Sequence, residues 1–335
     1  MSTLPLPPVP AEVLDAAGAV AFGKYTGAIP EIDWSLLGAP YRRGRWWRHT
    51  HHKRWQYLGL ATDDLFCGVA IVDVGWTNTA FAYVFDRQQK RLLGHFSQDG
   101  VPGLTARIND YPSSGAASHF RFLGKHIHFA ISHDAEATLD VVGHDFSLHA
   151  TLCLHDAAPS LTAIGPVEGG AVHATVKSSA IPLQGSVEVA GRRWLLDGGV
   201  GSSDYSNGFL ARDTAWRWAS AHSRAIGFNL QAGYFGNNEN ALWLDGEIIG
   251  LGTANFDFDP TDPMGMWHIT TDDGLLDVYF QPEGYRQENK NLLIAASRYI
   301  QPIGTFRGWV RAHCDAPLRV ITDLVGVTED HTARW

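Results

Sequence analysis

Alternating apolar and polar residues run through most of the chain, and this pattern predicts β-strands. Residues 126–133 alternate polar with apolar side chains, and residues 146–155 do so with His149 and His155 on the polar side. Successive side chains of a strand point to opposite faces, so each run has one apolar face that can be buried. Further strand candidates are 216–221, 227–234, 275–280 and 306–310.

Turn residues separate these candidate strands at short intervals. Asp245-Gly246 and Asp273-Gly274 each stand between two apolar runs, and Ala190-Gly191 has a similar position. A type I′ hairpin turn needs positive φ at both central residues, which Asp-Gly tolerates well. At least about a dozen strands follow one another at intervals of roughly 8–12 residues, which is typical of antiparallel barrels and sandwiches.

The same pattern divides the chain into three parts. Residues 1–40 form a proline-rich lead-in whose segment 11–22 is the best helix candidate. Small residues, Pro159 and Pro166 make 157–170 the best boundary inside the β-rich remainder. We therefore predict an all-β chain, with one β domain over 41–165 and a second, carrying the candidate site, over 166–335.

Composition agrees with this fold class and argues against several functions. Charged residues make up only 18 %, whereas glycine (35) and tryptophan (12) are plentiful. The formal net charge of −9 would repel a phosphate backbone, which argues against a nucleic-acid partner. No stretch approaches the roughly 18 apolar residues of a membrane span, and the first ten residues lack a signal-peptide pattern. We expect a cytoplasmic protein without membrane insertion, in which Cys67, Cys153 and Cys314 are buried thiols.

Sequence motifs for nucleotides and metals are missing. The chain has no phosphate-binding glycine loop, no His-Glu-x-x-His and no Gly-x-Ser-x-Gly. In a strand, His49 and His51 would share a face and could ligate an ion, but arginines and lysines on both sides disfavour a cation. We therefore expect neither a metal nor a cofactor.

Residues that could carry chemistry concentrate in the third quarter of the chain. Trp216, Trp218 and His222 would project from one face of a strand as an aromatic wall with a titratable edge. Burial beside such a wall would raise the pKa of Asp204 or Glu239, so either carboxyl could be a general acid near neutral pH. A structural interpretation stays open, because tryptophan pairs also fill cores and the Asp-Tyr-Ser-Asn-Gly run can be a simple turn.

The last seven residues, Glu-Asp-His-Thr-Ala-Arg-Trp, have an unusual composition for a chain end. Terminal segments usually fray, yet this one ends on an indole after a cluster of charged and imidazole groups. We expect it to dock into the β structure and cap one end, with His331 and Arg334 paired to carboxylates.

Several blocks of the chain resemble the domain-of-unknown-function family 2804 over about 41–335. These blocks are Lys53-Arg54-Trp55-x-Tyr57, 66–73, 81–87, Trp216-x-Trp218-Ala219-Ser220-Ala221, 239–243 and Glu329-Asp330-His331. The resemblance implies a lipocalin-like (calycin) fold, with two tandem antiparallel barrel or sandwich halves that enclose an apolar cavity. More distant relatives in that group include carotenoid 1,2-hydratases, AttH-like proteins, tocopherol cyclases and fungal cyclases of the Diels–Alderase type.

The resemblance also implies cofactor-free acid–base chemistry on an apolar, terpenoid or polyketide-like molecule. In those relatives an Asp-x-x-[Trp/His]-Gly motif precedes a Trp-x-Trp strand, and residues 204–208 followed by Trp216 and Trp218 match that order. Asn207 stands where the relatives have an aromatic residue or histidine. This departure leaves Tyr205 or His222 as alternative proton-handling groups.

We therefore expect a cofactor-independent hydratase or lyase, isomerase or cyclase acting on a small hydrophobic molecule. The candidate catalytic residues are Asp204, Tyr205, His222 and Glu239, and the candidate substrate-binding residues are Trp216, Trp218, Asn207, Asn229, Asn240 and His331. The alternatives are a non-catalytic carrier of a lipid-like ligand and, more weakly supported, a sugar-binding protein with tryptophan platforms. An exposed sheet edge could also pair two chains into a homodimer.

Overall fold

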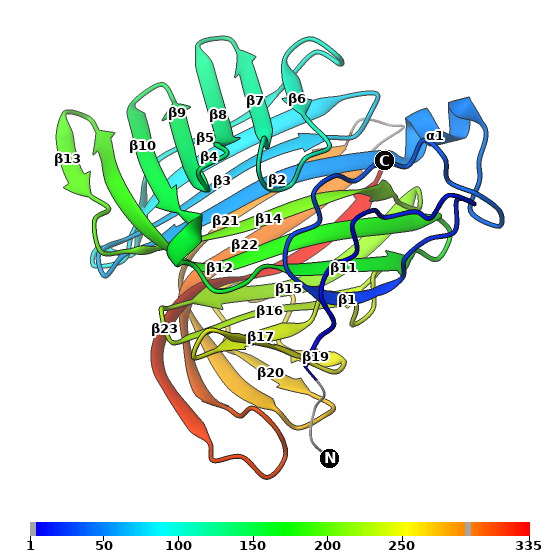
Figure 1. The fold of residues 1–335 in the computed structure, drawn as a ribbon. Coiled ribbons are helices and arrows are strands. Elements are labelled where there is room, and N and C mark those ends of the chain that lie inside the picture. The colour runs from blue at the N-terminus through cyan, green and yellow to red at the C-terminus, as the bar shows by residue number, and fades with distance from the viewer. Residues whose placement is uncertain (1–4, 292–295) are drawn as a thin grey trace.

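The computed structural model describes residues 5–291 and 296–335, and in this part of the chain nearly all regular structure is β (Figure 1). Two antiparallel sheets curl against each other, the first formed by the N-terminal strands and the second by the C-terminal strands. The predicted all-β class with two lipocalin-like halves is confirmed.

The first sheet contains fourteen strands of the described residues. Their bounds are β1 (Gly23–Thr26), β2 (His52–Ala61), β3 (Leu65–Asp73), β4 (Asn78–Asp86), β5 (Arg91–Asp99), β6 (Ala106–Ile108), β7 (Ala117–Phe122), β8 (Lys125–Ile131), β9 (Glu136–Val142), β10 (Phe146–Cys153), β11 (Leu161–Pro166), β12 (Val172–Val189), β13 (Arg192–Leu195) and β14 (Val200–Phe209). Their spatial order is β5-β4-β3-β2-β14-β12-β10-β9-β8-β7-β6, while β11 and β13 pair with β12, and β1 pairs with β11.

The second sheet contains nine strands of the described residues. Their bounds are β15 (Asp213–His222), β16 (Ile226–Gly233), β17 (Ala241–Leu244), β18 (Glu247–Gly250), β19 (Ala254–Asp257), β20 (Trp267–Thr271), β21 (Leu276–Asn291), β22 (Ala296–Val310) and β23 (Arg319–Arg334). Their order is β18-β17-β16-β15-β23-β22-β21-β20-β19, so the C-terminal strand β23 lies near the middle of the sheet.

The chain passes from the first sheet to the second between β14 and β15, at residues 210–212. The predicted seam at 157–170 contains β11 and lies inside the first sheet. The strands that follow it continue that sheet, since β12 pairs with β10, β11 and β14, and β14 pairs with β2. Since sheet membership does not define a folding unit, the division into domains at 165/166 stays a prediction.

The helix expected over residues 11–22 is wrong. The segment instead makes an isolated β-bridge between Leu14 and Val20. Gly18 turns the chain with a φ of 80°, which lies outside the helical region. A Cβ at this position would lie 2.3 Å from the carbonyl oxygen of Leu36, so the backbone of Gly18 packs directly against that of Leu36. The α-helix of the described residues is α1 (Arg45–His51). No helix among them is both long and apolar enough to cross a membrane.

The position of α1 also changes the histidine pair. His49 and His51 lie on this helix, two residues apart, so they do not share the strand face on which a shared ion was considered. The expectation of buried thiols holds only for Cys67, because Cys153 is half-buried and Cys314 is exposed.

The predicted hairpins are confirmed. Asp245-Gly246 joins β17 to β18 with φ values of 51° and 88°, and Ala190-Gly191 joins β12 to β13 with φ values of 49° and 80°. Asp273-Gly274 lies between β20 and β21, with positive φ at Gly274.

The strands are buried on both faces, and three of the apolar clusters lie in three successive layers. Leu58 and Leu60 of β2 face the interior of the first half, and Ala219 of β15 faces the interior of the second half. The intervening residue positions face the other sheet, where Tyr57 of β2 and Trp218 of β15 share a third apolar cluster. Because side chains fill the interior of each half, this third layer is the one that holds the cavity.

Candidate functional site

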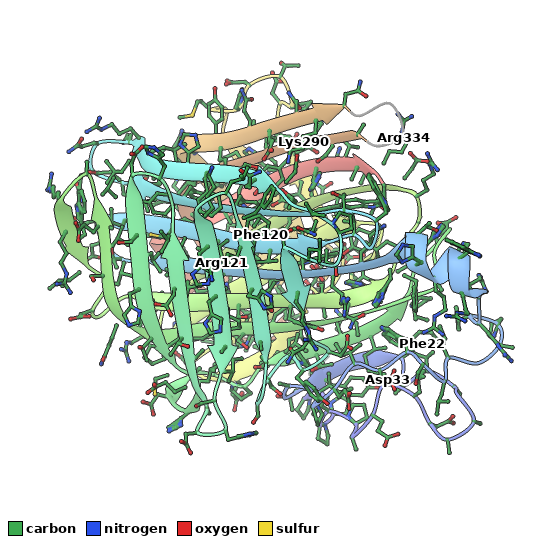
Figure 2. The ribbon with its side chains drawn as sticks, turned by 90° about the horizontal axis from the view of Figure 1, so that it is seen from above. Phe22, Asp33, Phe120, Arg121, Lys290 and Arg334 are labelled. Carbon is green, nitrogen blue, oxygen red and sulfur yellow. The ribbon has the colours of Figure 1, made fainter. Side chains whose placement is uncertain are left out.

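A cavity of about 250 Å³ lies between the two sheets. Its wall is rich in aromatic rings, which are those of Trp55, Tyr57, Trp76, Phe81, Trp216, Trp218, Tyr234, Tyr299 and Trp335. Lys290 and Arg334, near the ends of β21 and β23 and labelled in Figure 2, also line the cavity. This volume is slightly below the roughly 300–1,000 Å³ that pockets for small molecules usually span.

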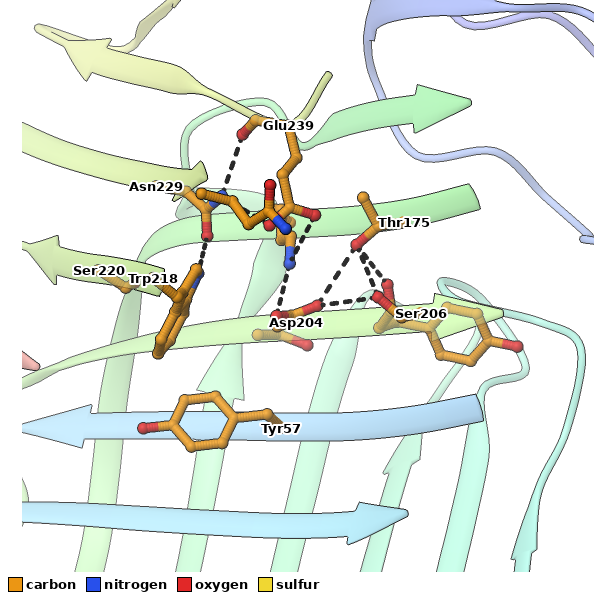
Figure 3. Close-up of polar contacts among 12 residues, drawn as sticks. Tyr57, Thr175, Asp204, Ser206, Trp218, Ser220, Asn229 and Glu239 are labelled. Carbon is orange, nitrogen blue, oxygen red and sulfur yellow. Dashed lines mark hydrogen bonds and ion pairs between the residues drawn. The ribbon is translucent and has the colours of Figure 1, made fainter. Parts of the chain in front are cut away.

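One end of the cavity is a buried lysine with two carboxyl groups. Nζ of Lys177, on β12, lies 2.5 Å from Oδ2 of Asp204 and 3.3 Å from Oε2 of Glu239 (Figure 3). Asp204 is 9 % exposed, while Lys177 and Glu239 are each 3 % exposed. Lys177 and Asp204 are opposite each other in the β12–β14 ladder, whereas Glu239 comes from the turn between β16 and β17 of the other sheet.

The charges of this cluster determine where a proton is held. Burial disfavours the ammonium of Lys177, but the two carboxyl groups outweigh burial and raise its pKa. Burial raises the pKa of Glu239, and the charge of Asp204 raises it further, against the attraction of Lys177. One ammonium balances one carboxylate, so the cluster is neutral when one of the two carboxyls is protonated. Because burial raises the pKa of Glu239 and its contact with the ammonium is longer than that of Asp204, Glu239 is the better placed of the two carboxyls to hold a proton.

Hydrogen bonds hold both carboxyl groups in place. Nε1 of Trp218 donates to Oδ1 of Asn229 (2.8 Å), and Nδ2 of Asn229 donates to the main-chain oxygen of Glu239 (3.0 Å) and to its Oε1 (3.4 Å). Oγ1 of Thr175 donates to Oδ1 of Asp204 over 3.3 Å (Figure 3). The orientation of Glu239 therefore depends on an indole that itself lines the cavity.

A second polar group in the wall is centred on Glu329 of β23. Its carboxylate accepts hydrogen bonds from Nε1 of Trp216 (2.8 Å) and from Nε2 of Gln301 (3.1 Å). Nδ1 of His331 lies 3.5 Å from Oε1 of the same carboxylate, and Nε2 of His331 lies 2.9 Å from Oγ of Ser297. The cavity wall thus combines aromatic rings with two groups of buried carboxyls, one at Asp204 and Glu239 and the other at Glu329.

The structure brings half of the predicted site residues to the cavity. Asp204, Glu239, Trp216, Trp218 and His331 all line it. Asn229 lies directly behind the wall, where it links Trp218 to Glu239 as described above.

The other four predicted residues do not reach this wall. Tyr205 and Asn207 point to the opposite face of β14, where the Tyr205 hydroxyl donates to the Asn109 carbonyl (2.8 Å) and Asn207 bonds His52 (2.7 Å). Successive side chains of a strand point to opposite faces, so Tyr205 and Asn207 point away from the cavity that Asp204 faces. The side-chain amide of Asn240 bonds main-chain groups, accepting from the N–H of Gln231 and donating to the carbonyl of Gly252.

His222 borders a separate small cavity of about 10 Å³. Its ring nitrogens lie within 2.6 Å and 2.7 Å of the hydroxyls of Ser179 and Ser220, and burial lowers its pKa to about 3. A neutral imidazole paired with two hydroxyls fits a structural role in the layer between the sheets.

Sequence reasoning missed Lys177, Gln231, Glu329 and Arg286, all of which line the cavity. A signal for Lys177 exists, because His173, Thr175 and Lys177 alternate with apolar residues in β12. The C-terminal segment was expected to be a cap, but residues 329–334 belong to the central strand β23. Trp335 still reaches the cavity, and its Nε1 donates to Oγ1 of Thr214 (3.0 Å).

The sequence and the structure were compared with known families and solved structures. The family model DUF2804, described as a domain of unknown function, matches residues 8–335. No protein of curated function matches the sequence.

Three solved structures are similar over nearly their whole length. An AttH-like protein from Nitrosomonas europaea is 12 % identical with a TM-score of 0.54, and the match covers 90 % of this chain and 98 % of that chain. CghA with Sch210972 is 10 % identical with a TM-score of 0.55, covering 98 % and 97 %. Kievitone hydratase from Nectria haematococca is 11 % identical with a TM-score of 0.49, covering 98 % of both chains. At such identities the likeness to the first two structures, whose TM-scores exceed 0.5, shows the fold alone, and it confirms the expected lipocalin-like architecture.

Proposed function

This chain belongs to the DUF2804 family, whose description names no activity, and we propose from its site that it is a cofactor-independent acid–base enzyme. Its substrate is a small hydrophobic molecule held in the cavity between the sheets. Its reaction is the addition or removal of water, an isomerisation or a cyclisation. The observation that carries this proposal is a buried carboxyl, Glu239, which lies 3.3 Å from the ammonium of Lys177 in the wall of an aromatic cavity and whose pKa is raised by burial.

The proposed chemistry begins with proton donation by Glu239. The carboxyl gives its proton to a double bond or an oxygen of the substrate, and the resulting carboxylate forms a full ion pair with Lys177. The lysine thus stabilises the conjugate base at the moment it forms, in a site from which water is largely excluded. The faces of Trp216 and Trp218 stabilise the positive charge that develops on the substrate.

The second half of the reaction returns the proton. Glu239 recovers it from a neighbouring substrate carbon, which gives an isomer or an elimination product, or from a water that adds to the substrate. The product therefore has the mass of the substrate, or differs from it by one water. In this scheme Asp204, which has the shorter contact with the ammonium, keeps Lys177 charged, and Asn229 and Trp218 orient the acid.

The first test is untargeted mass spectrometry of a cell metabolite extract incubated with the wild type and with E239Q. We expect an apolar metabolite to disappear with the wild type but not with E239Q, since general acid catalysis contributes about 10²–10⁴-fold in rate. E283Q is the matched control, because Glu283 is a partly buried carboxylate paired with Arg87 and lies outside the cavity wall. If E239Q turns over as fast as the wild type, the acid is misassigned; if all three proteins only retain the same unchanged molecule, the chain is a carrier.

A pH profile with the identified substrate tests the role of Asp204. D204N removes the charge that raises the pKa of Glu239 and leaves Lys177 with one carboxyl partner, so the pKa of Glu239 falls. We expect D204N to lose activity at neutral pH and to regain part of it at lower pH, whereas E239Q stays inactive throughout. Equal profiles for D204N and the wild type would show that the lysine does not couple the two carboxyls.

A further inference from the structure

Gln231 of β16 places a side-chain amide in the cavity wall without a protein partner. The residue is 2 % exposed, and among the described residues neither Oε1 nor Nε2 has a hydrogen-bonding partner. Its main chain is held firmly, because its N–H donates to Oδ1 of Asn240 (2.6 Å) and it pairs with Trp218 in the β15–β16 ladder. The amide is therefore fixed in place and unsatisfied.

Other buried glutamines of this protein are satisfied. Gln301 accepts from the Tyr83 hydroxyl (2.6 Å) and donates to Glu329, and Gln56 donates to the hydroxyl of Ser203 (2.9 Å). In folded proteins the large majority of buried polar side-chain atoms have such partners, because an unpaired one loses its hydration without compensation. An unpaired amide at a cavity wall thus indicates that its partner is a ligand.

The position of Gln231 relative to the acid is fixed by the strand. Asn229, which holds Glu239, and Gln231 are two residues apart on β16, so they project from the same face, roughly 7 Å apart. A ligand group bound to the amide would consequently lie beside the carboxyl that donates the proton. Trp216, Trp218 and Tyr234 are further members of the same wall.

We propose that Gln231 recognises an oxygen function of the substrate, a hydroxyl or a carbonyl, next to the atom that Glu239 protonates. The cavity accordingly selects an oxygenated apolar molecule over a hydrocarbon of the same shape. A carbonyl would accept from Nε2, and a hydroxyl would also donate to Oε1. This inference rests on the proposed function, because it takes the cavity to be the substrate site, but its test measures binding and stability instead of turnover.

The test compares two probes of nearly equal shape, 2-naphthol and 2-methylnaphthalene, by isothermal titration calorimetry on the wild type and on Q231M. Methionine keeps the length and volume of glutamine but has no amide. We expect the ratio of the two dissociation constants to shift by about tenfold between the proteins, in favour of naphthol in the wild type, the effect of about one hydrogen bond to a fixed partner. The greater hydrophobicity of 2-methylnaphthalene affects its binding to both proteins, so it cancels when the ratio for the wild type is compared with the ratio for Q231M.

Thermal unfolding without ligand gives an independent readout. Q231M removes an amide that already lacks a partner, so its unfolding midpoint should equal or exceed that of the wild type. Q56M is the matched control: it removes a buried amide that is hydrogen-bonded and lies away from the cavity, so its midpoint should fall while its naphthol preference stays that of the wild type.

Three outcomes overturn the inference: the wild type binds neither probe, Q231M keeps the preference of the wild type, or Q231M loses as much stability as Q56M. E239Q separates this inference from the proposed function. If E239Q retains both turnover and the naphthol preference, Gln231 still recognises the ligand but Glu239 is not the acid.

Discussion

Lys177 supplies the positive charge that makes the buried cluster possible, so its removal should be the most damaging change at the site. In K177M the apolar part of the side chain is kept while the ammonium is lost. Asp204 and Glu239 then remain, 9 % and 3 % exposed, without that cation. The fold must either bury uncompensated charge or take up a further proton.

The distance between Lys177 and Asp204 gives the size of the effect. At an effective dielectric constant of about 20, a contact of 2.5 Å between two unit charges corresponds to a gross attraction of about 7 kcal/mol. Desolvation of the buried ammonium offsets several kcal/mol of this, and removing one partner of a buried pair typically costs about 3–5 kcal/mol. Since a domain is stable by only about 5–15 kcal/mol, K177M should lose a large part of its free energy of unfolding.

The loss should also depend on pH. Without the lysine the pKa of Glu239 rises further, and a carboxyl whose folded pKa lies above its unfolded value near 4.3 loses stability as the pH rises through its folded pKa. K177M should therefore be closest to the wild type near pH 4 and furthest from it at pH 7 and above.

Urea denaturation at pH 5 and pH 7 measures both effects. K177M/D204N is the compensating variant, because it leaves a single carboxyl that can hold a proton and keep the cluster neutral, and it should recover most of the loss at pH 7. The reasoning is refuted if K177M unfolds at the same urea concentration as the wild type at pH 7, or if the second substitution recovers nothing.

Two further predictions concern residues around the cluster. W218F keeps a ring at the cavity wall but removes the N–H that holds Asn229. The kcat on the identified substrate should therefore fall by up to about tenfold, with little change in the urea midpoint. An unchanged kcat would show that this hydrogen bond does not orient Glu239. Lys53, 1 % exposed, has a pKa lowered to about 7 by burial, so between about pH 7 and its unfolded value near 10.4 the unfolded chain binds more protons and stability should rise with pH. K53M should flatten this rise in a denaturation series, and an equally steep rise in K53M would assign it to other groups.

Local patterns predicted the strands and the aromatic face, because both depend only on neighbouring residues. Period two put Trp216 and Trp218 on one face of β15, and the turn residues placed the hairpins. The helix was misplaced because the apolar content of 11–22 did not reveal that Gly18 packs against the backbone of Leu36.

The composition of the site could not be predicted in the same way. Lys177 meets Asp204 through the register of β12 with β14, strands separated by a hairpin, and it meets Glu239 only because the two sheets pack face to face. Local alternation marks which residues share a face, but not which strands become neighbours. The motif at residues 204–208 predicts Tyr205 and Asn207 as site residues only because they are close to Asp204 in sequence. The pleat of β14 points both side chains away from the cavity.

The division of the cluster between the two sheets links the proposed acid to the packing of the halves. Lys177 and Asp204 belong to the first sheet, whereas Glu239, Asn229 and Trp218 come from the second half. Burial is the largest cause of the raised pKa of Glu239, and that burial exists only when the halves are packed together. The apolar contacts between Tyr57, Trp218 and their neighbours therefore do more than hold the sheets together: they keep Glu239 buried and its pKa raised. Substitutions that loosen this layer should consequently weaken the acid function of Glu239 even where they touch none of the three charged groups.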